Sequence, residues 1–545
     1  MPRTAALRAV LHDVMRLRPR DAVAECDSLL ASTADPWLHS LRSFAAFFAQ
    51  DFAGATASAT MARSTATDDE SIVFAMVATA WASAGAASEY EGDPHRDALE
   101  ALPRLEGVDR HRRAFIEYLL AEASLGCARL DLAASVVEAC EPPPCDFLAE
   151  DGAAHPYLTM MTAMHARLLG FQGRVTDAIA AISRVDAAHG SAGELLVAAT
   201  TCLLQGNNAK RQAVRSIADR LEQELGEPSD YISAGCYILV SYGLIATADI
   251  TRAAAFVLKA GHTAGLDVLS IIDRALGLEM LVAAAVFEGD LGAAQAWRLR
   301  AEPLLEAPAA RSTVERLNSR VALLEGDAVA AADWAMRAVE HARQDGRAIE
   351  VAEGEIVLSR ARIALSERGA ASVGLEAMAA QAASSGHLSA HKAAARELRA
   401  IGRRLRPVPG SGWQGLSARE RDVALLVAEG FGNQAIALEL HLSEHTVQAH
   451  VSRVLAAFGA ASRLTVAAEL TRLLPRDPEA APPPALTPRQ QMVADEIANG
   501  LTNEAIAARL GVSVKTVEKH VSEILRRWQV ASRIGIARVA LSSAA

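Results

Sequence analysis

The sequence predicts an all-α protein. Aromatic residues make up only 4% of the 545 residues and alanine is very common, while hydrophobic residues reach 51% and charged residues 22%. Alanine has the highest helix propensity, whereas strands prefer branched and aromatic residues. Between about residue 20 and residue 405, apolar residues recur at helical spacing between short Gly, Asp or Pro breaks, and no segment alternates as a strand would. We therefore expect a large helical core.

An internal repeat runs through this region. Two copies, offset by 37 residues, share a Gly-Asp break followed by Ala, Trp and Ala, namely Gly289-Asp290 with Ala294, Trp297 and Ala301, and Gly326-Asp327 with Ala331, Trp334 and Ala338. Weaker copies begin at Ala128, Gly173 and Ala248. A small residue permits a tight turn between two antiparallel helices, and the alanines let the second helix approach its neighbours closely.

This pattern resembles degenerate tetratricopeptide repeats, which have turn Gly and packing Ala at similar offsets and a period of about 34 residues. Alanine-rich helical hairpins of another type are the alternative. In both cases each hairpin has an apolar face that only its neighbours can cover, so residues 1–405 are expected to form a stacked solenoid. Its concave surface would suit a protein partner or a small-molecule effector.

Two proline-rich breaks follow the array. Pro407, Pro409, Gly410 and Gly412 mark a linker over 406–415, and five prolines between 475 and 484 mark a second linker over 474–485. The breaks leave two C-terminal domains, at 416–473 and 486–545.

The two C-terminal domains are copies of one another. Residues 416–463 align without a gap on residues 486–533, with 21 of the 48 pairs identical. In each copy a first helix is predicted to end at a glycine, Gly430 or Gly500, that can adopt the left-handed C-terminal conformation. Asn433 or Asn503 is predicted to cap a second helix, and Ser443 or Ser513 a third.

The third helix is predicted to be amphipathic. Its buried side should carry residues spaced by four, namely Val447, Val451 and Leu455 in the first copy and Val517, Val521 and Leu525 in the second. The residues between them would face outward. A short capped helix with an exposed polar face, held by a tight helical turn, is the element that enters a DNA major groove.

The segments resemble the LuxR-type (GerE or FixJ type) helix-turn-helix (HTH), with its L-[ST]-x-R-E, G-x-x-N-x-x-I-A and L-x-x-S-x-x-T-V-x-x-H patterns. An array followed by this module also resembles the C-terminal half of the MalT-like large regulators, but the chain has no G-x-x-x-x-G-K-[ST], so their ATPase domain is not expected. The first copy departs from the family at Gly432, where Ser or Thr is usual. The second departs at Gln490, which replaces Glu, and at Glu496, which occupies a normally apolar position.

The resemblance implies double-stranded DNA as partner and a set of contact residues in each copy. In the second copy these are Ser513, Lys515, Thr516, Glu518, Lys519, Ser522, Arg526 and Arg527, and in the first they are Ser443, His445, Thr446, Gln448, Ala449, Ser452 and Arg453. Glu518, Lys519 and Ser522, or Gln448, Ala449 and Ser452, take the base-contact positions; Lys519 can donate to guanine and Glu518 can accept from cytosine. Lys515, Thr516, Arg526 and Arg527 are better suited to phosphates.

Charge makes the copies unequal. The net charge is -1 in 416–463 and +2 in 486–533. The chain total of -11 is the sum of +3 from residue 404 onward and -14 before it, so an acidic body carries a mildly basic tail. The second copy is therefore the expected reader of DNA, and the first a dimerisation or orienting module. An extended 474–485 linker would span roughly 37 Å, about the distance between half-sites one helical turn apart, so one chain could act as a covalent pseudo-dimer.

No enzymatic, metal or cofactor site is predicted. His387 and His391 lie four apart but have no third ligand nearby, so we interpret them as solvated. His450 and His520 recur at equivalent places and are expected to be structural. The six cysteines form no C-x-x-C pair and are expected to be buried reduced thiols, and the uncharged run 231–248 is expected to be a buried helix rather than a membrane span.

The sequence thus predicts a cytoplasmic, nucleoid-associated bacterial transcriptional regulator whose array senses an effector or docks a protein, with RNA polymerase and a second copy of the chain as further partners. Activation is implied by the resemblance alone. The alternative is a protein-interaction scaffold or anti-activator whose HTH modules have partly lost DNA binding.

Overall fold

The structure is a computed structural model that describes residues 3–86, 91–139, 156–185, 191–262, 265–405, 412–460, 462–473, 484–499, 501–530 and 533–544. The chain divides into two compact units, Met1–Arg404 and Leu405–Ala545. The described residues contain helices and no strand, so the predicted all-α fold class is confirmed.

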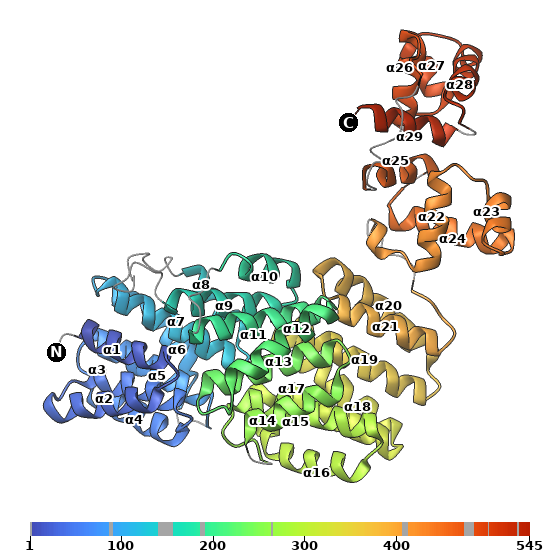
Figure 1. Ribbon diagram of the computed structural model, residues 1–545. Helices are drawn as coiled ribbons and strands as arrows, with labels where there is room; N and C mark the ends of the chain where they lie inside the picture. The colour runs from blue at the N-terminus through green and yellow to red at the C-terminus, as the bar shows by residue number, and fades with distance from the viewer. Residues whose placement is uncertain are drawn as a thin grey trace. The chain divides into compact units, whose positions relative to one another are not determined.

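The first unit is the helical array (Figure 1). Its helices are α1 (Arg3–Met15), α2 (Pro19–Ser32), α3 (Pro36–Phe48), α4 (Phe52–Thr65), α5 (Asp69–Ser83), α6 (Pro94–Ala101), η1 (Leu102–Leu105), α7 (Arg110–Gly126), α8 (Leu130–Ala139), α9 (Pro156–Phe171), α10 (Val175–Ile182), α11 (Ala192–Asn207), α12 (Arg211–Leu225), α13 (Tyr231–Ala246), α14 (Ile250–Gly261), α15 (Ile271–Glu288), α16 (Leu291–Ala301), η2 (Glu302–Glu306), α17 (Pro308–Glu325), α18 (Ala328–Gln344), α19 (Ala348–Ala364), α20 (Arg368–Ser385) and α21 (Leu388–Ala400).

The odd-numbered helices form one continuous layer of this array. Each of them from α1 to α19 packs against the next odd-numbered helix, and each even-numbered helix packs against the odd-numbered helices that precede and follow it in the chain. Helices eight to ten positions apart also meet, since α1 contacts α9, α3 contacts α13, α9 contacts α19 and α11 contacts α21. The array is therefore a solenoid whose successive turns touch.

The repeat positions read from the sequence have the predicted roles. The break residue has a positive φ in all five copies, at Ala128 (58°), Gly173 (84°), Ala248 (61°), Gly289 (75°) and Gly326 (85°). In each turn the following residue donates its N–H to a carbonyl five residues earlier, as Asp290 does to Ala285 at 2.9 Å. This is the Schellman closure, in which orphan carbonyls at a helix end gain donors.

The alanines of the repeat are buried where the second helix meets its neighbours. Ala294, Ala301 and Ala331 are fully buried, and Ala338 is 2% exposed. Trp297 and Trp334 are half-buried. A larger side chain at the alanine positions would push apart helices that pack closely, so these residues set the spacing of the hairpins.

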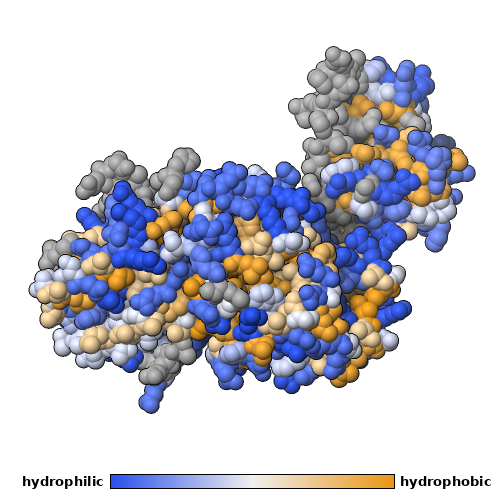
Figure 2. Space-filling view, turned by 60° about the horizontal axis from the view of Figure 1, so that its bottom comes forward, coloured by the Kyte–Doolittle hydropathy of each residue, from blue (hydrophilic) through white to orange (hydrophobic). Residues whose placement is uncertain are grey.

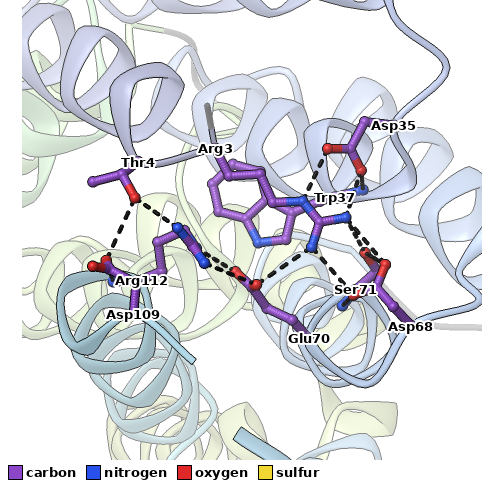
Figure 3. A network of polar contacts seen from close by, with 9 residues as sticks. All are labelled: Arg3, Thr4, Asp35, Trp37, Asp68, Glu70, Ser71, Asp109 and Arg112. Carbon is purple, nitrogen blue, oxygen red and sulfur yellow. Dashed lines mark hydrogen bonds and ion pairs between the residues drawn. The ribbon is translucent and has the colours of Figure 1, made fainter. Parts of the chain in front are cut away.

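A polar network ties the first helix of the array to its neighbours (Figure 3). Arg3 on α1 reaches Asp35 at 2.8 Å, Asp68 at 3.1 Å and Glu70 at 3.3 Å. Asp35 and Asp68 are also the N-caps of α3 and α5, where their side chains accept backbone N–H groups. Arg112 on α7 joins the network by donating to Glu70 at 2.6 Å. The guanidinium of Arg3 thus links α1 to the first turns of α3 and α5.

A second ionic cluster is buried between α15, α17 and α19. The Arg316 side chain is only 1% exposed, and its guanidinium lies 3.2 Å from both Glu350 and Glu353. It also donates to Glu279 at 2.6 Å. Arg347, 3% exposed, pairs with Glu350 as well. Breaking such a pair would leave an uncompensated buried charge, so the cluster fixes the register of these three helices.

The remaining predictions for the array concern cysteines and the uncharged run. Cys26, Cys202 and Cys236 are buried free thiols and Cys127 is a half-buried one, while Cys140 and Cys145 lie outside the described residues. Burial raises the pKa of Cys26 and of Cys202 to about 12, which keeps both thiols protonated. The uncharged run forms α13, which is largely buried as predicted. Among the described residues, no helix has the length and apolar character that a membrane crossing requires.

The surface of the array is mixed in polarity. On the face drawn in Figure 2, apolar areas are interspersed with hydrophilic ones. Single large apolar residues such as Phe287, Leu299 and Val373 are more than two-thirds exposed, at 68%, 69% and 68%.

Candidate nucleic-acid interface

The second unit contains two four-helix modules (Figure 1). The first follows η3 (Gly412–Gly415) and comprises α22 (Ala418–Ala428), α23 (Asn433–Glu439), α24 (Glu444–Ala457) and α25 (Arg463–Leu473). The second comprises α26 (Pro488–Ala498), α27 (Asn503–Leu510), α28 (Val514–Trp528) and α29 (Arg533–Ala544). Residues 474–483 of the proline-rich linker lie outside the described residues, so its predicted extended form is not tested.

The third helix of each module begins as predicted. Ser443 is the N-cap of α24 and accepts the N–H of Thr446, and Ser513 is the N-cap of α28 and accepts the N–H of Thr516. Each cap satisfies a donor that the first turn of a helix leaves without a partner. The first helix also ends as predicted in the first module, where Gly430 has a φ of 92°. Gly500 lies outside the described residues.

The prediction that Asn433 and Asn503 are N-caps is wrong by one position. The caps are Gly432, which has no side chain, and Thr502, which accepts the N–H of Ala505. Each asparagine is the first helical residue, and its side-chain oxygen accepts a hydrogen bond from an arginine at the start of the fourth helix, Arg463 or Arg533. The identical Asn and Ser-Arg positions of the two copies therefore connect the second helix to the fourth. Their recurrence in the sequence is the pattern from which this contact could have been predicted.

An arginine in the first helix holds the end of the second. Arg419 donates to the carbonyl of Leu440, and Arg489 donates to the carbonyl of Leu510 at 2.7 Å. The last carbonyls of a helix lack intrahelical donors, and the C-terminal end of a helix carries a partial negative charge that attracts a cation. The arginine shared by the two copies is thus structural, and it positions the helical turn that precedes the third helix.

The third helix is amphipathic, although its buried side is shifted slightly from the prediction. Val447 and Val517 are fully buried, as expected, and Val451 is 6% exposed. Leu455, Val521 and Leu525 are only half-buried. The deepest residues of the later turns are instead Val454 and Ile524, both at 0% exposure. A spacing of seven matches two helical turns better than eight, because 3.6 residues make one turn.

The outer face of α28 carries the predicted contact residues of the second module. Ser513, Lys515, Glu518, Lys519, Ser522, Arg526 and Arg527 are exposed, and Thr516 is half-buried. None of the four basic residues in this set has an ion-pair partner among the described residues. The Ser522 hydroxyl donates to the carbonyl of Glu518 at 3.0 Å. This face therefore presents charge that the protein itself does not neutralise.

The corresponding face of α24 is weaker in charge. Ser443, His445, Thr446, Gln448 and Ser452 are exposed and Ala449 is half-buried. Arg453, the basic residue predicted here, is half-buried and lies 3.5 Å from Glu420, so its charge is balanced within the module. Burial opposes ionisation of Glu420, but hydrogen bonds from Ser417 and the charge of Arg453 outweigh it and keep the pKa of Glu420 below its ordinary value.

The same contact is reversed in the second module. Glu523 occupies the position of Arg453, and Gln490 occupies that of Glu420; the amide of Gln490 donates to the Glu523 carboxylate at 2.9 Å. A glutamate at 490 would face another carboxylate there. This pairing explains the departure of Gln490 from the family pattern. Glu496, the other departure, forms an ion pair with Arg509 at 3.1 Å.

The two modules contact each other through their fourth helices. Helices α25 and α29 pack side by side. Leu464 on α25 is buried in the core of the second module, and Ile534 on α29 packs against the cores of both modules. These two residues share the 70-residue offset of the alignment and lie one position beyond its end. A contact in which each copy gives the same residue to the other is the property of a two-fold interface.

Two of the histidines outside the recognition surface are less exposed than predicted. His387 is buried at 4% exposure rather than solvated, and His391 is half-buried. The array causes this, because Thr176 on α10 lies close to Gly386, the residue that precedes His387. His450 is buried as a structural residue, 3.9 Å from Glu420. The described residues include no group of three or more acidic, His or Cys side chains placed to hold a metal ion.

Comparison with known proteins identifies the modules. Residues 414–470 and 484–540 both match the family described as bacterial regulatory proteins, luxR family. A protein of Mycobacterium bovis named as an HTH-type transcriptional regulator is 44% identical over 85 residues, which are 16% of this chain and 9% of that protein. The transcriptional regulatory protein YhcZ of Bacillus subtilis is 49% identical over 57 residues, covering 10% of this chain and 27% of that protein. The response regulator PprB of Pseudomonas aeruginosa is 47% identical over 60 residues, covering 11% and 22%.

The matched segments are short, and the chain spans about a tenth of the length of the mycobacterial relatives. Among solved structures, a chain of the Cut9–Hcn1 hetero-tetramer of the APC/C is similar over 73% of this chain and 93% of that chain, with 14% identity and a TM-score of 0.22. These values carry no functional inference for the array. The two matches lie at the offset of the internal repeat, on the modules whose geometry is described above. The C-terminal region of this chain therefore consists of two tandem HTH domains of the bacterial LuxR family.

Proposed function

We propose that the protein is a cytoplasmic, DNA-binding transcriptional regulator that reads double-stranded DNA mainly through α28. The observation that supports this most strongly is the outer face of that helix, where Lys515, Lys519, Arg526 and Arg527 are exposed and without ion-pair partners in the described structure. Unneutralised basic side chains on a capped, exposed helix match the charge of phosphates and the width of a major groove.

The contact residues of α28 fall into two groups, one placed to meet bases and one placed to meet phosphates. Lys519, Glu518 and Ser522 lie in the middle of α28, where a helix in the groove meets base edges. Lys515 in the first turn and Arg526 and Arg527 in the last turn flank them, and we assign these to phosphates. Base contacts would set the preferred sequence, and phosphate contacts would set affinity and its dependence on salt.

The two modules are proposed to act together as a pseudo-dimer. The packing of α25 on α29, with Leu464 and Ile534 exchanged, gives the pair a two-fold character within one chain. Two-fold related readers bind inverted half-sites. In this proposal the first module, whose outer face lacks free basic residues, positions the second and makes the weaker contact.

The helical array is proposed to be the sensing part. It is acidic, so it would be repelled by DNA, and its turns touch at points far apart in the sequence. A ligand or a protein bound to the array would change how the regulator acts on promoters. The regulator is proposed to be an activator that contacts RNA polymerase. A second copy of the chain would be a further partner.

The proposal is tested by selecting genomic DNA fragments with the full chain. Fragments should be recovered with a shared sequence motif, and recovery should fall steeply as salt is raised, because counterions are released from each contacted phosphate. Recovery of no enriched motif at any salt concentration would contradict the proposal and favour a protein-interaction scaffold whose modules have lost DNA affinity. The balanced charge of Arg453 in the first module is the observation on which that alternative rests.

A further inference from the structure

A cleft of about 600 Å³ lies in the array where two of its turns meet. One wall is the α9–α10 turn, with Gly173 and Arg174, together with Thr176 at the start of α10. The other wall is formed by α18, α19 and α20 with the start of α21. Ligand sites in proteins typically have volumes of about 300–1,000 Å³. The cleft therefore has the size of a site for a small organic molecule.

The walls are held close by glycines. A Cβ on Gly173 would lie 2.8 Å from the Cβ of Ala348, and one on Gly386 would lie 2.4 Å from the Thr176 hydroxyl. Lys392 on α21 also donates to the carbonyl of Ala209, which follows α11, at 3.4 Å. Segments about 170 to 210 residues apart in the sequence thus touch beside the cleft, and a molecule within it would contact both.

The charges in the cleft are balanced. Arg174 bonds Asp177 at 2.8 Å, and Arg343 lies 3.6 Å from Glu355. The other lining groups are amides, hydroxyls and apolar side chains, including Gln381, Ser385 and Met378. A charged ligand would find no unpaired counter-charge here and would lose its hydration, which is costly.

His387 supplies a buried polar group to the same cleft. It lines the cleft at 4% exposure, and neither ring nitrogen has a hydrogen-bond partner among the described residues. Burial lowers the pKa of His387 to about 4, so the ring is neutral near pH 7. A neutral imidazole offers one donor and one acceptor. The ring lines the cleft without a partner from the described residues, so a polar group of a ligand can complete its hydrogen bonds.

We propose that this cleft is the effector site of the regulator and that it takes an uncharged amphipathic molecule bearing an amide or hydroxyl group. The polar group would pair with His387, and the apolar part would lie over Met378 and the neighbouring alanines. Because the ligand would touch both walls, binding would hold the α9–α10 turn against α18–α21, the last hairpins before the HTH domains. This proposal rests on the proposed function of the array as a sensor.

The test uses three probes of similar size and different charge on the full chain: 2-naphthamide, 2-naphthoate and 2-naphthylmethylammonium. Affinities are measured by ligand-detected saturation-transfer nuclear magnetic resonance. We expect naphthamide to bind about tenfold or more tightly than either ion, a difference of about 1.4 kcal/mol or more. Hydrogen exchange should slow in both α10 and α20 when naphthamide is added.

Two tryptophan variants on α20 locate the binding. Ala377 is exposed and lines the cleft, whereas Ala380 is exposed on the same helix and does not line it. A377W should therefore abolish naphthamide binding, and A380W should leave it unchanged. H387F keeps the ring shape without its nitrogens and should weaken naphthamide about tenfold without lowering the Tm.

Equal binding by A377W and the unaltered chain would overturn the proposal, as would tighter binding of either charged probe. None of these measurements involves DNA. If the cleft fails this test while DNA selection succeeds, only the effector site is refuted, and the reverse outcome refutes only the DNA-binding function.

Discussion

At the scale of single residues, the two HTH domains join their first and third helices by the same contact with donor and acceptor exchanged. Glu420 with Arg453 in the first domain becomes Gln490 with Glu523 in the second. The exchange preserves the link between the first and third helices. In the second domain the acidic residue, Glu523, lies on α28, the helix that carries the free basic residues. Its partner, Gln490, is uncharged.

This exchange predicts the effect of Q490E. The new carboxylate would lie beside Glu523, where the amide nitrogen now sits 2.9 Å from a carboxylate oxygen. We expect a loss of roughly 1–4 kcal/mol in the stability of the second domain, the range for like charges near a protein surface. Thermal unfolding followed by circular dichroism measures it. Q490E with E523R recreates the pair of the first domain and should restore stability; failure of this rescue would refute the assigned contact.

The Arg3 network predicts a pH dependence. The hydrogen bond from Arg3 holds the pKa of Asp68 below its ordinary value. A carboxyl group whose folded pKa is lowered contributes stability above its unfolded pKa of about 3.9, and this contribution is lost as the pH falls through the folded pKa. R3A should therefore lower stability by roughly 1 kcal/mol at pH 7, because the network is partly exposed. The difference should shrink below about pH 4, a range set by the Asp pKa. R16A is the control. Arg16 is exposed and directly follows α1, so its removal should change the stability little at either pH.

Residues differ in how far the sequence could predict their environment. Lys515 and Lys519 were placed on the outer face because helical periodicity and the Ser513 cap are local properties. The burial of His387 could not be predicted, since it lies in a cleft that it lines together with residues of the α9–α10 turn, more than 200 residues earlier. Leu464 and Ile534 were missed for the same reason: their partners lie in the other domain.

At the scale of elements, the second helices of the two domains differ in their caps. Thr502 accepts the N–H of Ala505 at 3.3 Å, whereas Gly432 offers no side chain to α23. The backbone of Gly432, with φ -76° and ψ 165°, suits any residue, and a Cβ there would meet nothing within 4 Å. The glycine is therefore required neither by strain nor by crowding.

This difference predicts opposite effects of two substitutions. T502A removes a cap and should destabilise the second domain by about 1 kcal/mol, while G432T adds one and should stabilise the first by a few tenths of a kcal/mol. Differential scanning calorimetry on the full chain measures both. A G432T protein with a lower Tm would show that the geometry described for this cap is wrong.

The elements of the array were predictable because each hairpin is closed by local chemistry. The positive φ at Gly289 and Gly326 follows from a small residue before an N-capping Asp, and the buried alanines follow at fixed offsets. The contact of one solenoid turn with the next was not predictable, because it depends on a small rotation per hairpin that accumulates along the array.

At the scale of the whole molecule, the pairing of α25 with α29 predicts the arrangement of DNA sites. If the two-fold pairing is kept on DNA, one chain should prefer inverted half-sites to direct repeats of the same half-site. I534D places a charge in this interface and should remove the preference while each domain still binds a single half-site weakly. Fluorescence anisotropy on the two site arrangements measures the preference. Equal affinity for both arrangements in the unaltered chain would exclude the pseudo-dimer.

The most direct test of DNA reading by α28 is the affinity of the full chain for a selected fragment, with K515A and K519A combined. Loss of one base contact and one phosphate contact should weaken binding by roughly tenfold to several hundredfold and reduce the salt dependence by about one unit of slope. A variant that removes two polar side chains from the corresponding face of the first domain, H445A with Q448A, should weaken it much less. Undiminished binding by K515A with K519A, or a larger loss in the first-domain variant, would contradict the assignment of α28 as the principal reader.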